Sequence, residues 1–283
     1  FSGPASQAMI AGLVPPEHLG NAVALSSSAY QTAIIGGPAI GGLLYTFGPS
    51  VVFGATALCF CISLVAYLIM HKRGVKARPE RFSFAYMAGG IHYIFAKKII
   101  LGAITLDLFA VLLGGATALL PVYARDIFLV GPEELGLLRS APALGAFLTS
   151  LLLAHRPLRS KAGLRMFQAV ALFGAATIGF GLSTSFWVAL PFLFILGVTD
   201  MISVFVRSTL MQVETPDEMR GRVAAVNMVF VGASNELGQF ESGLLAWLVG
   251  PVMAVVLGGV GTIAVAGICA RAFPALLKRD QPT

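Results

Sequence analysis

The chain alternates between long apolar runs and short polar connections. Eight runs reach the roughly 17–25 residues that a helix needs to cross a bilayer, and an incomplete run precedes them at 1–14. The complete runs are 22–46, 50–70, 99–122, 134–154, 164–183, 186–212, 222–248 and 252–273. The pattern predicts an all-α fold, a polytopic membrane helix bundle whose first partner is the lipid bilayer.

The composition favours the same class. Hydrophobic residues make up 57% of the chain and charged residues 11%, whereas a soluble domain carries roughly 25% charged residues. Cys59, Cys61 and Cys269 all lie inside apolar runs. They therefore behave as small hydrophobic residues rather than as a disulfide set or a metal site.

The net charge of +6 is distributed as a topology signal. Nearly all Lys and Arg lie in or beside four segments that alternation places on one side: 71–98, 155–165, 213–222 and 274–283. The positive-inside rule makes that side cytoplasmic. Arg125 and Arg139 are the exceptions and fall on the outer side. This distribution argues against nucleic acid as a partner.

An internal repeat links the two ends of the chain. Pro15-x-Glu17-x-x-Gly20 returns as Pro216-x-Glu218-x-x-Gly221, and Gly37-x4-Gly42-Leu-Leu44 returns as Gly238-x4-Gly243-Leu-Leu245. Each copy is a polar turn that opens a long apolar helix rich in small residues. A long repeat in such a chain is typical of duplicated transporter bundles.

The repeat also predicts the domain organisation. Residues 1–73 are the end of a first half (part of its fourth helix, then its fifth and sixth), 74–98 form a cytoplasmic or interfacial linker, and 99–283 form a second half of six helices with a short cytoplasmic tail. Compared with the second unit, the first is expected to lack about three and a half helices.

Four sequence stretches then resemble the major facilitator superfamily of transporters. They are Gly37-Pro-Ala-Ile-Gly-Gly42, Asp107-Leu-Phe-Ala-Val-Leu-Leu-Gly-Gly115, Thr215-Pro-Asp-Glu-Met-Arg-Gly-Arg222 and Asn235-Glu-Leu-Gly-Gln-Phe-Glu-Ser-Gly243. The first is similar to the superfamily's fifth-helix antiporter motif. The others resemble the bacterial branch of enterobactin exporters and transmembrane secretion effectors. The basic loop at 155–163 lacks the acidic residue of the superfamily's loop motif.

The Gly-Pro stretch has a physical interpretation of its own. Gly37, Gly41 and Gly42 leave one helix face without side chains, so a neighbouring backbone can approach closely. Pro38 removes a backbone donor and bends the helix. The stretch is either a moving contact, as expected of an antiporter hinge, or a static packing seam. The resemblance likewise assigns Arg220, Gly221 and Arg222 to a cytoplasmic loop.

Charged residues inside the membrane are the candidates for a transport pathway, because each costs a few kcal/mol unless it is paired, hydrated or neutralised. Asp107, Asp200 and Glu236 are expected near the midplane, and Glu241 nearer the outer side. Arg207 lies on the face of Asp200 but closer to the inner end.

Each of these charged residues also has a structural alternative. Asp107 could be locked by a hydrogen bond, Asp200 and Arg207 could form a structural pair, and Glu236 with Asn235 could be a satisfied polar cluster. Gln31 and Asn235 are expected to add neutral polar contacts, together with Tyr30 and Asn227.

Enzyme chemistry has no support in the sequence. The serines lack a nearby His, the four histidines lie in loops or interfacial segments, and there is no phosphate loop, metal cluster or dinucleotide motif, so no cofactor is expected. The sequence instead predicts a monomeric, multi-pass, proton-coupled exporter of a small amphiphilic molecule in the bacterial inner membrane, working by alternating access. The alternative is a non-transporting membrane protein or scaffold remnant of such a transporter.

Overall fold

The computed structural model describes residues 33, 36–38, 40–69, 84–155 and 161–279. Within these residues the chain is helical and contains no strand, so the predicted all-α bundle is confirmed. The predicted run 1–14, most of the run 22–46, and Gln31 lie outside the described residues.

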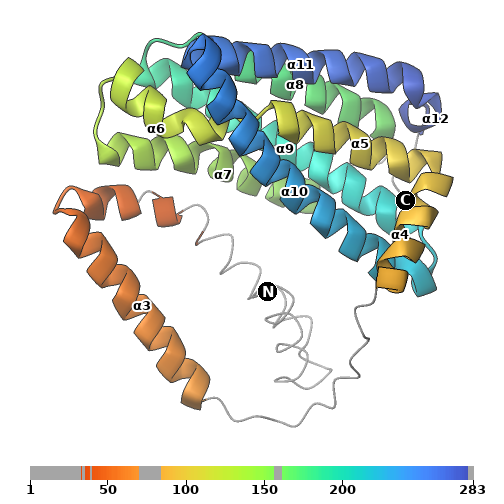
Figure 1. Ribbon diagram of the computed structural model, residues 1–283, viewed down its shortest axis with the longest axis horizontal. Coiled ribbons are helices and arrows are strands. Elements are labelled where there is room, and N and C mark those ends of the chain that lie inside the picture. The colour runs from red at the N-terminus through yellow and green to blue at the C-terminus, as the bar shows by residue number, and fades with distance from the viewer. Residues whose placement is uncertain (1–32, 34–35, 39, 70–83, 156–160, 280–283) are drawn as a thin grey trace.

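The helices match most of the predicted runs closely. Their bounds are α3 Pro49–Ile69, α4 Phe84–Ala96, α5 Lys98–Leu113, α7 Pro132–His155, α8 Ala162–Gly181, α9 Phe186–Glu214, α10 Asp217–Val249, α11 Pro251–Ala272 and α12 Pro274–Leu277. In Figure 1, α5 to α11 form one bundle and α10 runs obliquely across it, while α3 stands apart. A short helical piece at 40–45 precedes α3.

Six helical segments of the described chain are long and apolar enough to cross a membrane. They are 49–66, 98–127, 132–153, 162–181, 186–214 and 251–272. The predicted span 222–248 is not among them. Its helix α10 is long enough, but charged and amide side chains are spread along it, including Arg222, Glu236 and Glu241. The exposed side chains of α3, by contrast, are almost all apolar, as a lipid-facing helix requires.

The predicted span 99–122 is not one uninterrupted helix, which corrects the expectation from the sequence. Helix α5 ends at Leu113, and the chain continues through the 3₁₀ turn η2 (Ala116–Leu119), α6 (Leu120–Val122) and the π-turn η3 (Tyr123–Ile127). At the break, a Cβ on Gly115 would lie 2.8 Å from the carbonyl oxygen of Gly238 on α10. Only glycine allows this close crossing of two backbones.

Apolar side chains gather in two main clusters inside the bundle. One surrounds Tyr123 and Phe180 towards one end of the helices, and the other surrounds Leu106 and Met166 towards the opposite end. Small residues bring the helices close between them, as membrane helices commonly do. The polar side chains described next lie on α5, α9 and α10, next in sequence to members of the second cluster such as Leu106 and Val206.

Candidate functional site

Two neighbouring helices contribute charged and polar side chains to a buried cluster. Asp107 lies on α5, and Ser203 and Arg207 lie one turn apart on α9. Asp107 is 4% exposed and Arg207 5%. From the helix rise, Asp107 is about 14 Å from the start of α5 and Arg207 about 10 Å from the end of α9. Both therefore lie well inside an apolar layer about 30 Å thick.

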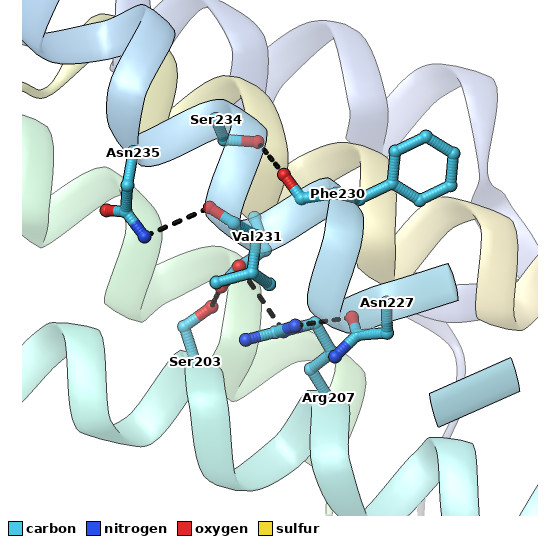
Figure 2. A network of polar contacts seen from close by, with 8 residues as sticks. Ser203, Arg207, Asn227, Phe230, Val231, Ser234 and Asn235 are labelled. Carbon is cyan, nitrogen blue, oxygen red and sulfur yellow. Dashed lines mark hydrogen bonds and ion pairs between the residues drawn. The ribbon is translucent and has the colours of Figure 1, made fainter. Parts of the chain in front are cut away.

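Arg207 joins three helices through this cluster (Figure 2). Its Nε lies 3.3 Å from Oδ2 of Asp107 on α5. Its Nη1 donates a hydrogen bond of 2.6 Å to Oδ1 of Asn227 on α10. The hydroxyl of Ser203 donates to Oδ1 of Asp107 at 3.0 Å. A change in the charge of Asp107 would consequently be felt by α5, α9 and α10 together.

The ion pair between Arg207 and Asp107 rests on one close contact. Nε of Arg207 is buried and makes no hydrogen bond, so the pair lacks the two parallel bonds of the strongest Arg–carboxylate pairs. Removing one partner of a buried pair still costs about 3–5 kcal/mol, because a buried charge is left alone. Breaking this pair by mutation is therefore costly, although the pair lacks the strongest Arg–carboxylate geometry.

Asp200 lies beside this pair without belonging to it. It shares a cavity of about 10 Å³ with Asp107, Thr199 and Ser203, a volume close to that of one water molecule. Among the described residues Asp200 makes no hydrogen bond or ion pair, but the charges of Asp107 and Arg207 act on it. A structural pair of Arg207 with Asp200 was open from the sequence; the structure pairs Arg207 with Asp107.

The cluster holds two carboxyl groups and one guanidinium. With all three ionised it carries a net negative charge in an apolar layer, which is costly. One proton on either carboxyl group neutralises the cluster. Reversible protonation is therefore the chemistry that this set of side chains is suited to perform.

Glu236 and Asn235 do not join this cluster. Nine residues separate Asn227 from Glu236, which places their side chains about 180° apart around α10. Both Glu236 and Asn235 are exposed, and the amide nitrogen of Asn235 donates to the carbonyl oxygen of Val231 at 3.0 Å, as Figure 2 shows. Glu241 is half-buried further along the same helix. Of the three acids predicted near the midplane, Asp107 and Asp200 thus share one small cavity, whereas Glu236 lies on the exposed face of α10.

The Gly-Pro stretch meets helix α7 at one glycine. A Cβ on Gly42 would lie 2.5 Å from the carbonyl oxygen of Pro132 and 3.1 Å from Cα of Gly136. Gly37 and Gly41 have no atom within 4 Å of the corresponding position. With Pro38 and Gly42, they line a cavity of about 690 Å³ between this helix, η3 and α7. Close approach and open space therefore lie side by side on the helical segment that carries the motif, residues 36–38 and 40–45, which is called the motif helix below.

The predicted cytoplasmic-loop residues lie in the first turns of α10. Nε of Arg220 donates to the carbonyl oxygen of Gln212 at 3.3 Å, and Gly221 is exposed. The backbone of Arg222 packs against Gly90 of α4, where a Cβ would meet its carbonyl oxygen at 2.7 Å. These contacts fix the entry of α10 against α4.

Two features of the site were not evident from the sequence. One is the contact of Ser203 with Asp107. Its sequence signal was that Ser203 lies one helical turn before Arg207 and therefore on the same face of α9. The other is that Arg139 borders two cavities. Its sequence signal was a charged residue inside the apolar run 134–154. In the described part of the chain, no group of three His, Cys, Asp or Glu is arranged to hold a metal ion.

These observations define a multi-pass helical membrane protein with a buried, protonatable charge cluster. The sequence matches the transmembrane secretion effector family over residues 1–280. The chain therefore belongs to this family of the major facilitator superfamily, whose members are transporters rather than enzymes.

Several curated relatives are named enterobactin exporters. The chain is 28% identical over 262 residues to the enterobactin exporter of Salmonella typhi, which covers 89% of this chain and 61% of the relative. It is 26% identical over 260 residues to the enterobactin exporter of Escherichia coli O1:K1 / APEC, covering 89% and 60%. The chain thus spans about 60% of the length of these relatives.

Proposed function

We propose that the protein is a secondary active exporter in the bacterial inner membrane, driven by protons, for a small amphiphilic molecule of siderophore-like or drug-like character. The observation that carries the proposal is the buried cluster of Asp107, Asp200 and Arg207 around a water-sized cavity. Two acids and one base in an apolar layer change net charge when one proton binds. The names of the relatives support export as the direction.

The coupling follows from the contacts of Arg207. When the cluster is deprotonated, Asp107 attracts Arg207 and holds α5, α9 and α10 together. A proton on Asp107 weakens this attraction and leaves Asp200 as the nearer countercharge for Arg207. The guanidinium then has two alternative partners in one cluster, and switching between them moves α5 relative to α9. Such a two-state element is what alternating access requires.

The motif helix supplies the second moving contact in this proposal. Gly42 lies against α7 with backbone atoms at the contact, so the two helices can slide without interlocked side chains. The open cavity beside Gly37 and Gly41 gives the helix room to tilt. The transport cycle combines a protonation switch within the bundle and a glycine contact at its edge.

The test uses everted membrane vesicles from cells expressing the protein from its native gene. Accumulation of enterobactin and of ethidium is measured with and without an imposed pH gradient, for the native protein and for Asp107→Asn and Asp200→Asn. Each variant is expected to lose gradient-driven accumulation by at least about tenfold, because each removes a titratable charge worth a few kcal/mol. Glu236→Gln is the matched control on the exposed face of α10 and is expected to retain it.

Two results would contradict the proposal. In the first, the native protein shows no gradient-dependent accumulation of either compound. In the second, both Asn variants keep full accumulation and its dependence on the gradient, which would make the cluster structural. Equal membrane abundance of all variants is checked by quantitative blotting.

A further inference from the structure

We propose that Arg139 and the two cavities that it borders form the binding site for the anionic group of an amphiphilic substrate. This inference rests on the proposed export function and names the charge of its substrate. It starts from the position of Arg139, seven residues into α7 and therefore about 10 Å from the start of that helix. Its side chain is exposed, and at this depth of an apolar layer its charge requires a countercharge or water.

The carboxylates nearest in sequence are already engaged elsewhere. Asp126 pairs with Arg125 through contacts of 2.6 Å and 3.0 Å. Glu134 accepts a hydrogen bond of 3.0 Å from the backbone nitrogen of Gly131. Among the described residues, Arg139 takes part in no ion pair or hydrogen bond. Its guanidinium is thus the available cation of this region.

The two cavities beside Arg139 differ in character. The smaller, about 310 Å³, includes Thr117 and Gln239 in its lining, which can donate hydrogen bonds. The larger, about 690 Å³, has a largely apolar wall that includes Leu135, Val130 and Tyr45. Ligand sites of drug-sized molecules are typically 300–1,000 Å³ and mostly apolar with a few fixed polar groups. The pair of cavities therefore suits a molecule with an anionic head at Arg139 and an apolar body beside the motif helix.

This site is separate from the protonatable cluster. Neither cavity includes Asp107 or Asp200 in its lining, and those residues face their own small cavity between α5 and α9. Substrate anion and proton therefore bind at different places and need not compete for one carboxylate. They are linked through α10, which contributes Gln239 to the substrate site and Asn227 to the cluster. Coupling between them is then conformational.

The test is equilibrium binding of tritiated 2-naphthoate to the purified protein, expressed from its native gene and reconstituted in lipid nanodiscs. Unlabelled 2-naphthoate is expected to displace the label, and uncharged 2-naphthamide, which has nearly the same shape, is not. Arg139→Gln is expected to weaken binding by at least about tenfold, because a charge-assisted contact is lost. Arg139→Lys keeps the charge and is expected to retain most of the affinity.

Arg271→Gln is the matched control, since Arg271 is an exposed cation near the end of α11 and lines neither cavity. The affinity of this variant is expected to stay within about twofold of the native value, because it removes the same charge away from the proposed site. The inference is overturned if the native protein does not bind 2-naphthoate, if 2-naphthamide competes equally, or if Arg139→Gln binds normally. It is also overturned if Arg271→Gln loses as much affinity as Arg139→Gln.

Binding and transport separate this inference from the proposed function. If the protein binds 2-naphthoate through Arg139 but shows no gradient-driven flux, the proposed anion site stands and the proposed export function is wrong. Gradient-driven accumulation of ethidium by a native protein that does not bind 2-naphthoate keeps the export function and removes the anion site.

Discussion

The two copies of the internal repeat place equivalent glycines in opposite surroundings. In the first copy Gly42 contacts the backbone of α7, and Gly37 has open space beside it. In the second copy a Cβ on Gly238, the equivalent of Gly37, would lie 2.9 Å from the carbonyl oxygens of Val111 and Leu112. A Cβ on Gly243, the equivalent of Gly42, would have no neighbouring atom within 4 Å. Close contact and open space have changed places between the copies.

Helix geometry explains how one sequence pattern serves both arrangements. Glycines five residues apart lie about 140° from each other around a helix, so a single neighbouring helix can contact only one of them. The motif at 37–42 lies beside α7, and the motif at 238–243 lies beside α5. Each copy of the repeat thus has two helix faces that allow close approach, and the position of the neighbouring helix determines which face makes the contact. Sequence equivalence within a duplicated bundle does not imply equivalent packing.

The largest expected effect follows from replacing Gly238. A leucine there would push against two backbone carbonyls of α5, which cannot move aside as a side chain can. Gly238→Leu is expected to lower stability by about 3 kcal/mol or more, above the range of ordinary overpacking. The measurement is thermal unfolding of the detergent-purified protein. Gly243→Leu is the matched control in the same helix and should unfold close to the native temperature; equal losses in both variants would remove the asymmetry.

The same comparison in the first copy predicts a loss of transport. Gly42→Leu would separate the motif helix from α7 at Pro132 and Gly136, and is expected to reduce gradient-driven accumulation at least about tenfold at equal abundance. Gly41→Leu places the new side chain towards the 690 Å³ cavity instead, and is expected to reduce accumulation less. Vesicle assays on the two variants compare them directly. A more severe loss in Gly41→Leu would show that the motif acts through the cavity and not through the contact.

A smaller effect is expected where the second copy begins. The hydroxyl of Tyr93 on α4 donates to the carbonyl oxygen of Glu214 at 2.7 Å, just before α10. Tyr93→Phe removes this hydrogen bond and is expected to cost about 0.5–1.5 kcal/mol, seen as a modest fall in unfolding temperature. Transport should persist in this variant. Loss of transport without loss of stability would instead assign the contact a part in the cycle.

Much of the fold was predictable because apolar run length and positive charge report directly on membrane spans. The runs at 50–70, 134–154, 164–183, 186–212 and 252–273 all correspond to helices. The break after Leu113 was not predicted, although Gly114-Gly115 and Pro121 are local signals for it, because membrane helices tolerate glycine and proline. Local pattern can mark such a break, but it does not identify Gly238, far away in the sequence, as the crossing partner.

The candidate site was predictable in its residues but not in its partners. Asp107, Asp200 and Arg207 were recognisable as costly charges inside apolar runs. Which acid pairs with Arg207 depends on how α5 is rotated and shifted against α9, and this is set by packing over the whole interface. The same limit applies to Glu236, whose depth resembles that of Asp107 but whose side of α10 is opposite to Asn227. The depth of a residue in the membrane follows from its position along the helix, whereas the direction in which its side chain points depends on how the neighbouring helices pack.

The most direct test of proton coupling through the Asp107–Asp200–Arg207 cluster measures proton flux itself. Purified protein is reconstituted into liposomes that contain a pH-sensitive dye, and the compound that the vesicles accumulate, enterobactin or ethidium, is added under a pH gradient. The native protein is expected to discharge the gradient only when the compound is present. Asp200→Asn should not discharge it, because Arg207 loses its alternative partner, whereas the control Glu236→Gln should discharge it at the native rate. Substrate-dependent proton flux that survives in both Asp200→Asn and Asp107→Asn would contradict the account.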